Sequence, residues 1–246
     1  MGMQQTNRDA MGRDRTGGSE RTVHPSLRWL RWALWTLALL LPATAGAAES
    51  WESLGVIDGV KVWRKEVPDS NVFAFRGEIT ADVNMGKLVS VFLDKSQRKY
   101  WVDRYADSRE LDPIDPMHTT YWIQFKLPPG ISDRDYVLKA TGESDPATGT
   151  FVAKIRSVEH PRAPVDDCCV RANVVQTYYR FEAVKGQEKV KMLVEVHTDP
   201  KGWLPGWVVN LIQKNWPSKT LNGLIRRSRA AEIHPFGDFA SWHSRP

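Results

Sequence analysis

The stretch from Asp199 to Arg227 reads DPKGWLPGWVVNLIQKNWPSKTLNGLIRR and predicts the one long helix of the chain. Pro205 suits the first turn, where its missing N–H costs nothing and its fixed φ angle already fits a helix. Pro217 is expected to kink the helix, because it removes the hydrogen bond to the carbonyl of Gln213. The apolar positions before the kink recur with the helical period and form one stripe: Leu204, Trp207, Val208, Leu211 and Ile212.

Asn215 falls inside this apolar stripe and leaves two interpretations of the helix open. In the first, this is an ordinary core helix that closes a domain. In the second, the helix covers a cavity and Asn215 faces whatever the cavity holds. Beyond the kink, Leu221, Leu224 and Ile225 point in a new direction. The rest of the chain must therefore decide between the two.

Composition indicates a globular protein with one sizeable core, since 41% of the 246 residues are hydrophobic and 26% are charged. The formal net charge of +5 comes partly from the first 45 residues, which hold six Arg and three acidic residues. The remaining chain carries 28 basic and 26 acidic residues and is nearly balanced. Such a chain gives no electrostatic reason to expect a nucleic-acid partner.

The only two cysteines, Cys168 and Cys169, are neighbours in the sequence. Adjacent residues rarely meet the Cα separation that disulfides prefer, so we expect no disulfide here. A metal site is not expected either, because no further Cys or His ligands lie nearby. No His pair has helical metal-ligand spacing and no phosphate-binding loop or G-x-S-x-G motif occurs, so no metal or cofactor is expected.

The first part of the chain has the features of a secretory signal peptide. Arg28 and Arg31 precede the apolar run Trp32–Leu41, and small residues follow at 43–48. Cleavage is expected after Ala45 or Ala47. An uncleaved anchor is the alternative, but the apolar run falls well short of the roughly 20 residues that span a bilayer. The signal looks bacterial and predicts a periplasmic or secreted protein.

These features divide the chain into an extension and signal peptide at 1–47, a single domain at 48–230 and a polar tail at 231–246. The tail is expected to have no regular structure from His234 onward. A short helix is expected at Ser50–Leu54, a second one capped by Asn84, and a third at Ser96–Tyr100.

Seven or eight segments at hairpin spacing have the pattern of β-strands. They are Val60–Arg64, Val72–Ile79, Tyr105–Leu111, Thr119–Lys126, Tyr136–Gly142, Thr150–Val158, Val170–Glu182 and Val190–Thr198. No strand–helix–strand units separate them, so the fold class is α+β with an antiparallel sheet. One face of such a sheet must be covered, and only the last helix is long enough to do so.

Two sequence blocks resemble the START (StAR-related lipid transfer) domain family. The first comprises Arg98–Trp101 (RKYW) and Pro128–Val137 (PPGISDRDYV). The second is Asp199–Asn210 (DPKGWLPGWVVN), with Trp216-Pro217 and Leu221 beyond it. The resemblance covers roughly 51–227, and two blocks in the family's order are more specific than either one alone. The chain departs from the family's usual pattern at Pro129-Gly130 and at Trp203.

This resemblance implies a helix-grip fold, in which a curved antiparallel sheet wraps around the C-terminal helix and encloses an apolar tunnel. It implies a lipid-binding or lipid-transfer protein that holds one hydrophobic ligand, such as a sterol or a phospholipid, and that meets membranes transiently as a monomer. The alternative is an enzyme of the same fold, similar to aromatases and cyclases, that acts on a hydrophobic polycyclic substrate.

The expected ligand-binding residues come from the first helix–loop block, one strand and the last helix. They are Trp101, Tyr121, Ile123, Phe125, Arg134, Trp207, Val208, Leu211, Ile212 and Asn215. A one-residue error in strand register would exchange Tyr121, Ile123 and Phe125 for Thr120, Trp122 and Gln124. Arg134 is expected to fix its loop by pairing with Asp133 or Asp135, or else to hold a polar lipid head. His197 beside Glu195 is a weak candidate for catalysis, and no catalytic residue is assigned.

Overall fold

The structure is a computed structural model that describes residues 50–244, without the side chains of residues 206, 207, 210 and 211. The predicted leader at 1–47 lies outside the described residues, as do the last two residues of the tail. No helix in the described part of the chain is both long enough and apolar enough to cross a membrane.

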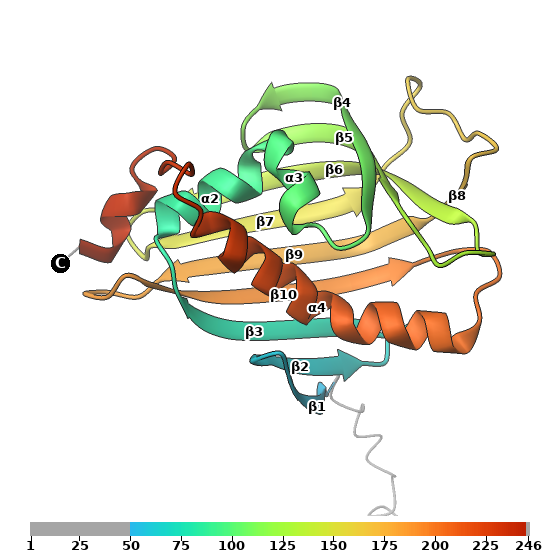
Figure 1. Cartoon of the computed structure of the whole chain (residues 1–246), viewed down its shortest axis with the longest axis horizontal. Coiled ribbons are helices and arrows are strands. Elements are labelled where there is room, and N and C mark those ends of the chain that lie inside the picture. Colours follow the sequence, from blue (N-terminus) through green and yellow to red (C-terminus); the bar gives the residue numbers. More distant parts are fainter. Residues whose placement is uncertain (1–49, 245–246) are drawn as a thin grey trace, which may run out of the picture. The chain divides into compact units, whose positions relative to one another are not determined.

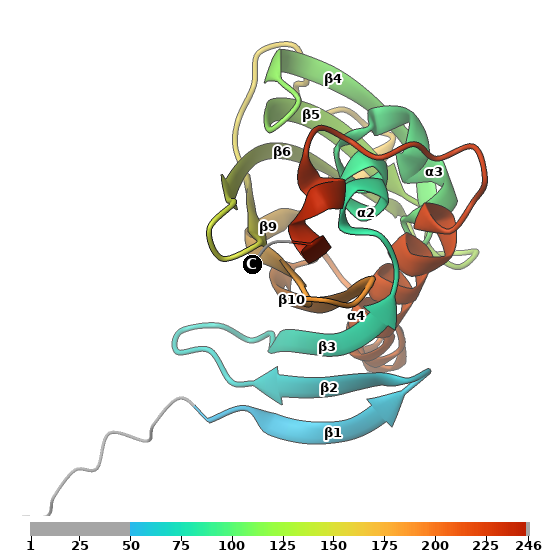
Figure 2. The same cartoon turned by 90° about the vertical axis from the view of Figure 1, so that its left-hand side faces the viewer.

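Ten strands within the described residues form one sheet that curves around the last helix (Figures 1 and 2). They are β1 (Glu52–Ile57), β2 (Val60–Lys65), β3 (Ala74–Asp82), β4 (Tyr105–Asp115), β5 (His118–Phe125), β6 (Asp133–Asp145), β7 (Thr150–Ser157), β8 (Cys169–Arg171), β9 (Asn173–Ala183) and β10 (Lys189–Asp199). The order across the sheet is β1-β2-β3-β10-β9-β7-β6-β5-β4, with antiparallel neighbours throughout. The short β8 pairs with β6 in parallel.

The helical elements of the described chain are α2 (Met85–Leu93), η2 (Lys95–Gln97), α3 (Arg98–Trp101), α4 (Gly206–Ser228) and η3 (Phe239–Ser244). The side chain of Asn84 accepts a hydrogen bond from the backbone N–H of Lys87, so the predicted cap of α2 is confirmed. Pro217 lies inside α4, and Figure 1 shows the helix changing direction along its course. The predicted grip of a curved antiparallel sheet on a long C-terminal helix is confirmed.

Two close contacts hold α4 against β3 and α3. A Cβ atom added to Gly77 of β3 would come within 2.7 Å of the Cβ atom of Pro217. A Cβ atom added to Gly223 would collide with the carbonyl oxygen of Trp101 at the end of α3. Glycine is therefore required at both places, because neither leaves room for a Cβ atom. Beyond Pro217, Leu221, Leu224 and Ile225 of α4 are buried in the main hydrophobic core.

The first strand replaces the helix expected at Ser50–Leu54, and that prediction was wrong. Asp58 and Gly59 both have positive φ angles, and Ile57 pairs with Val60 across them. A two-residue Asp-Gly loop with this geometry favours a tight hairpin, which draws the preceding segment into the sheet as β1.

The tail beyond residue 231 is ordered in the structure, so the expectation of no regular structure was wrong. Phe239 and Trp242 are almost fully buried and pack on one another, with ring centroids 4.3 Å apart. The backbone N–H of Met85 donates to Nε2 of His243, which ties η3 to the start of α2. A few large apolar residues in a polar stretch are sufficient to anchor it, because each removes much apolar surface from water.

The structure also joins Cys168 and Cys169 in a disulfide, against expectation. Their Cα atoms are 3.8 Å apart, below the usual range for disulfides, but that preference does not forbid a bond between neighbours.

Candidate functional site

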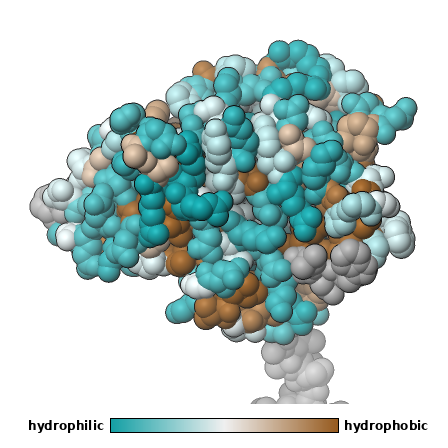
Figure 3. Space-filling model, in the orientation of Figure 1, coloured by the Kyte–Doolittle hydropathy of each residue, from teal (hydrophilic) through white to brown (hydrophobic). Residues whose placement is uncertain are grey.

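A pocket of about 200 Å³ lies between the inner face of the sheet and the first half of α4. Its wall is mainly apolar and rich in aromatic rings, contributed by strands, α2, α3 and α4. These aromatic residues are Phe75, Phe92, Trp101, Tyr121, Phe125, Tyr136, Phe151, Tyr179 and Trp216. Figure 3 shows the outer surface on the side of α4 as mostly hydrophilic, with hydrophobic residues in separate patches. Several rings of the wall are buried, among them Tyr121, Phe151 and Tyr179.

Strand β5 forms one side of the pocket. Tyr121, Ile123 and Phe125 point into it, while Trp122 faces the other side of the sheet and packs with Leu111 and Val137. The alternation predicted from the sequence has the right register here, because successive side chains of a strand point to opposite faces. The first pocket-lining residue of β5, Thr119, is six residues from Phe125, so the wall runs for about 20 Å along the strand.

Helix α4 closes the pocket with a different face from the one predicted. The side chains that line it are Val209, Ile212, Gln213, Trp216 and Thr220. Ile212 lines the pocket as predicted. Val208 and Asn215 do not, so the prediction that these two residues face the ligand was wrong. The side chains of Trp207 and Leu211 lie outside the described residues. The apolar stripe was misleading because Gln213 and Thr220, both polar, belong to the wall, whereas the buried Val208 does not.

Arg98 places a positive charge within this apolar wall. Its side chain comes from the first residue of α3, is only 7% exposed and lies over the ring of Tyr121, 3.8 Å from the ring centroid. Its Nη1 atom is buried without a hydrogen-bond partner, and Arg98 takes part in none of the ion pairs of the described residues. A buried cation usually has an anionic partner, so this arrangement points to a group that enters the pocket from outside the chain.

Three further polar atoms of the wall are buried without a hydrogen-bond partner among the described residues. They are Nε1 of Trp101, Oγ1 of Thr119 and Nε of Arg104, which lies 3.6 Å from the carboxylate of Asp103. Trp101 lies on α3 together with Arg98, and Thr119 is two residues before Tyr121, whose ring lies under the guanidinium of Arg98. The unpaired polar atoms of Arg98 and Thr119 therefore lie toward the same end of the β5 wall, and apolar surface extends from there toward Phe125.

The phenols of the wall are neutral at physiological pH. Burial raises the pKa of Tyr121, and the charge of Arg98 offsets part of that rise. Burial likewise raises the pKa of Tyr136 and of Tyr179 far above the ordinary value of 10.0. Each phenol is therefore a hydrogen-bond donor or acceptor and not an anion that would neutralise Arg98.

Arg134 also lines the pocket, but it is engaged with backbone carbonyls. Its guanidinium donates to the carbonyl oxygens of Ser132, Pro200, Lys201 and Trp203, so it fixes the loop that leads into α4. The predicted role in fixing a loop is confirmed, but the predicted partners were wrong. Asp133 pairs with Lys126, and Asp135 pairs with Arg171.

Little in the wall is arranged for acid–base catalysis. Among the described lining residues the only carboxylate is Asp103, which pairs with Arg104 and Lys219. The candidate pair Glu195 and His197 is not part of the wall, since Glu195 binds Arg76 and Nε2 of His197 lies 3.0 Å from Oγ of Ser70. No cluster of three or more potential metal ligands occurs within the described part of the chain.

The sequence of this chain matches the model of the START domain over residues 36–232. The chain belongs to the START domain family. It is 27% identical to the phosphatidylcholine transfer protein of Bos taurus over 190 residues, which cover 75% of this chain and 86% of that protein. An uncharacterized protein of Pseudomonas aeruginosa is 25% identical over 195 residues, 79% of this chain and 95% of the relative.

Solved START structures share the fold. The human StAR-related lipid transfer protein 5 superposes with a TM-score of 0.66 at 19% identity, covering 82% of this chain and 95% of that one. A STAR-related lipid transfer protein from Xanthomonas axonopodis gives 0.61 at 23% identity, covering 73% and 99%. The START resemblance of the two sequence blocks is thereby confirmed.

Sequence reasoning missed Arg98, Gln213 and Trp216 as wall residues. Arg98 and Trp216 both stand in the START motifs, so a signal for them was present. This signal indicates the family and not the site, because a motif alone does not say which of its side chains points inward. Gln213 carries no comparable signal.

Proposed function

We propose that this START domain binds one lipid molecule in the pocket and transfers it between membranes without changing it chemically. The observation that carries the proposal is Arg98, a buried cation without an anionic partner in a mainly apolar wall. A lipid with a phosphate or carboxylate group supplies that partner, while its chains cover the aromatic surface along β5. Relatives that are named phosphatidylcholine transfer proteins support this ligand class.

This arrangement favours a phospholipid over a sterol. A sterol offers one hydroxyl, which can accept a hydrogen bond from Arg98 but cannot neutralise its charge. An anionic phosphate accepts hydrogen bonds from several N–H groups of the guanidinium at once. Such charge-assisted hydrogen bonds are about twice as strong as neutral ones.

The test is to incubate the mature chain with vesicles of phosphatidylcholine and phosphatidylglycerol and to re-isolate the protein for native mass spectrometry. We expect one phospholipid per chain. Ala140→Trp fills the pocket wall and is expected to abolish loading. The matched control Lys139→Trp puts the same bulk on the exposed neighbour and is expected to load normally. Equal loading of both variants would place the lipid elsewhere.

The same experiment distinguishes carrier from enzyme. A carrier returns the lipid with an unchanged mass, whereas an aromatase- or cyclase-like enzyme converts a polycyclic substrate. The described wall lacks a free acid–base pair, which supports the carrier.

The carrier is proposed to act as a monomer outside the cytoplasm, after removal of the leader. The basic, apolar and small-residue order of residues 28–48 supports export. N-terminal sequencing of protein from the periplasmic fraction should give a start at Gly46 or Ala48, and sedimentation should give the monomer mass. A start before Trp32 in the membrane fraction would indicate an anchor instead.

Transient membrane contact is proposed at the loop that leads into α4. Trp203 on this loop is 79% exposed, and tryptophan suits the lipid–water interface because its ring is apolar with one polar N–H. Trp203→Ala should weaken vesicle binding in a sedimentation assay, while Trp51→Ala, in the segment that leads into β1, should not.

A further inference from the structure

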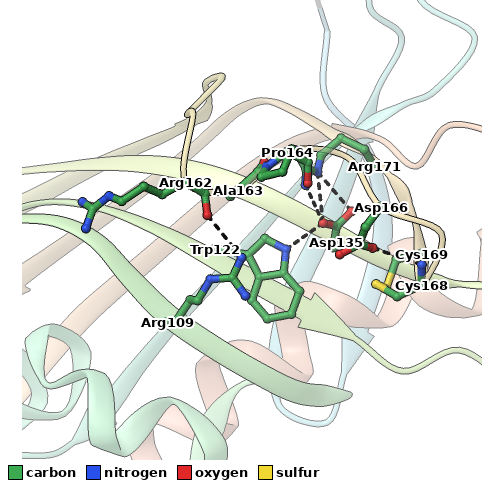
Figure 4. A network of polar contacts seen from close by, with 10 residues as sticks. All are labelled: Arg109, Trp122, Asp135, Arg162, Ala163, Pro164, Asp166, Cys168, Cys169 and Arg171. Atoms are coloured by element: carbon green, nitrogen blue, oxygen red, sulfur yellow. Dashed lines mark hydrogen bonds and ion pairs between the residues drawn. A yellow bond between two sulfur atoms is a disulfide. The ribbon is translucent and has the colours of Figure 1, made fainter.

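The disulfide between Cys168 and Cys169 lies on the surface at the start of β8. Cys168 is exposed, and Cys169, the first residue of the strand, is half-buried. The backbone N–H of Cys168 donates to the carboxylate of Asp166 in the preceding loop (Figure 4). A thiol in solution can therefore reach this bond, which no part of the proposed lipid site uses.

On one side, β8 is joined to the sheet through a buried carboxylate. Asp135 of β6 accepts from Arg171 of β8, with an Nη2–Oδ2 distance of 2.8 Å, and from Nε1 of Trp122 at 2.7 Å. Arg171 also donates to the carbonyls of Ala163 and Pro164 (Figure 4). This network fixes the last residue of the strand, whereas the disulfide constrains its first.

On the other side, β8 contacts the segment that leads to the pocket. A Cβ atom on Gly202 would lie 3.4 Å from Cγ1 of Val170 and 3.5 Å from Nη2 of Arg134. Arg134, which pairs with Val170 across the strands, holds the carbonyls of Pro200 and Lys201. Pro200 and Leu204 line the pocket, so β8 supports this end of its wall.

We propose that Cys168–Cys169 is a redox-active pair whose reduction by a dithiol loosens β8 and the adjoining segment Pro200–Leu204. A thiolate of the reductant attacks the exposed sulfur of Cys168, and the sulfur of Cys169 leaves as a thiolate. The second thiol of the reductant then attacks the mixed disulfide and releases Cys168. The protein gains two electrons and two protons, and the reductant becomes a disulfide.

The constraint acts on the backbone directly. A bond between neighbouring residues closes a small ring that fixes the torsions between them, and opening it restores that freedom. The loop it closes is the shortest one possible, so it adds little to global stability, and reduction should act locally and not unfold the domain. Any effect on the lipid rests on the proposed function, but the effect on β8 does not.

Hydrogen exchange of the lipid-free mature protein tests the proposal, with and without dithiothreitol. Reduction is expected to speed exchange about tenfold at the amides of β8 and at Lys201–Trp203, the change that loop closure of this size allows. Amides of Met192–Val194, in the centre of the sheet, should not change and serve as the internal control. The variant Cys168→Ser/Cys169→Ser should exchange like the reduced protein in both buffers.

Three results would overturn the proposal: free thiols in the protein isolated without reductant, no change in exchange on reduction, or faster exchange throughout the sheet. Serine variants that exchange like the oxidised protein would overturn it as well. A local change in exchange in a protein that never loads lipid would support this inference and refute the proposed function. In a protein that does load, reduction should speed lipid release to acceptor vesicles.

Discussion

The guanidinium of Arg98 lies over the ring of Tyr121 on β5, 3.8 Å from the ring centroid. The guanidinium of Arg109, on β4, lies over the ring of the next residue of β5, Trp122, at 4.7 Å. The two pairs have the same chemistry on opposite faces of one strand. Arg98 is buried in the pocket wall, whereas Arg109 is exposed. Arg109 also donates to the carbonyl oxygen of Arg162, whereas the buried Nη1 of Arg98 has no acceptor among the described residues.

Arg98→Met is therefore predicted to weaken phospholipid binding without destabilising the lipid-free protein. Loss of hydrogen bonds to a charged group of about 1.5–3 kcal/mol corresponds to a tenfold to hundredfold lower affinity. The unfolding free energy should stay the same or rise, since the variant removes a buried, unpaired charge. Arg109→Met is the control and should bind normally. Fluorescent-lipid titration and urea unfolding measure the two effects, and equal affinity in both variants would contradict the role of Arg98.

Trp216→Ala and Asn215→Ala test which face of α4 closes the pocket. Trp216 lines the pocket, so its removal should lower lipid affinity by about 2 kcal/mol through lost apolar contact. Asn215 lies off the wall, and Asn215→Ala should change affinity by less than about 0.5 kcal/mol. Both affinities follow from the same titration. The reverse order would restore the register that the sequence alone predicts.

Gly223→Ala is predicted to destabilise the protein although alanine favours helices. The new Cβ atom would collide with the carbonyl oxygen of Trp101, which belongs to rigid backbone. Overpacking of about 1–3 kcal/mol exceeds the helix-propensity gain of about 1 kcal/mol. Thermal unfolding should show a midpoint lower by a few degrees, while Lys214→Ala on the exposed side of α4 should show none of this loss. An unchanged midpoint in Gly223→Ala would mean that α4 and α3 are not in contact there.

His197 should make stability fall on mild acidification. Burial lowers the pKa of His197 from its ordinary value of 6.5, although Asp199 acts in the opposite direction. The folded protein then binds fewer protons than the unfolded chain below that value, so stability is complete above pH 6.5 and decreases as the pH falls through the lower folded pKa.

Carboxylates act in a separate, more acidic window. Burial alone would raise the pKa of Asp133, but hydrogen bonds from Leu127 and Lys126 hold it below 3.8, so its contribution is lost only in stronger acid.

Urea unfolding between pH 7.5 and 5 therefore measures the contribution of His197 without that of Asp133. His197→Asn should flatten the slope, and His234→Asn, on an exposed residue, should leave it unchanged. A wild-type slope in His197→Asn would assign the effect to another group.

Phe239→Ala should destabilise the whole domain if the tail belongs to the core. Phe239 is 3% exposed and contacts Phe151 of β7, with ring centroids 6.0 Å apart. Removing a buried aromatic side chain costs about 3–5 kcal/mol. Ser244→Ala, at an exposed position of the same turn, is the control. A single cooperative transition at lower temperature is expected for Phe239→Ala, and an unchanged transition would show that the tail is dispensable.

Sequence patterns predicted more of the fold than of the ligand-binding site. Alternation in β5 and the cap at Asn84 are local signals, and the structure agrees with them, because period and capping act within a few residues. The START blocks supplied the long-range arrangement that local patterns lack. Asp58-Gly59 is also a local signal for a hairpin, and the helix predicted at Ser50–Leu54 did not take it into account.

The site was harder because it depends on which side of an element faces inward. In α4 the faces differ little in polarity, since Gln213 and Thr220 line the pocket and Val208 does not. A rotation by one residue then moves every side chain to a new direction, and only tertiary contacts such as Gly223 against Trp101 fix it. The disulfide of Cys168 and Cys169 likewise had no local pattern that favoured it.

The pairing of β3 with β10 has a consequence for how the chain reaches its native state. The first strands of the domain must wait for a partner that follows roughly a hundred residues later, and contacts of such sequence separation slow folding. The sheet cannot close until β10 is available, and α4 and the tail follow β10 in the chain. Until then the apolar strands lack their cover, and the unfolded chain is expected to depend on chaperones that bind exposed hydrophobic segments.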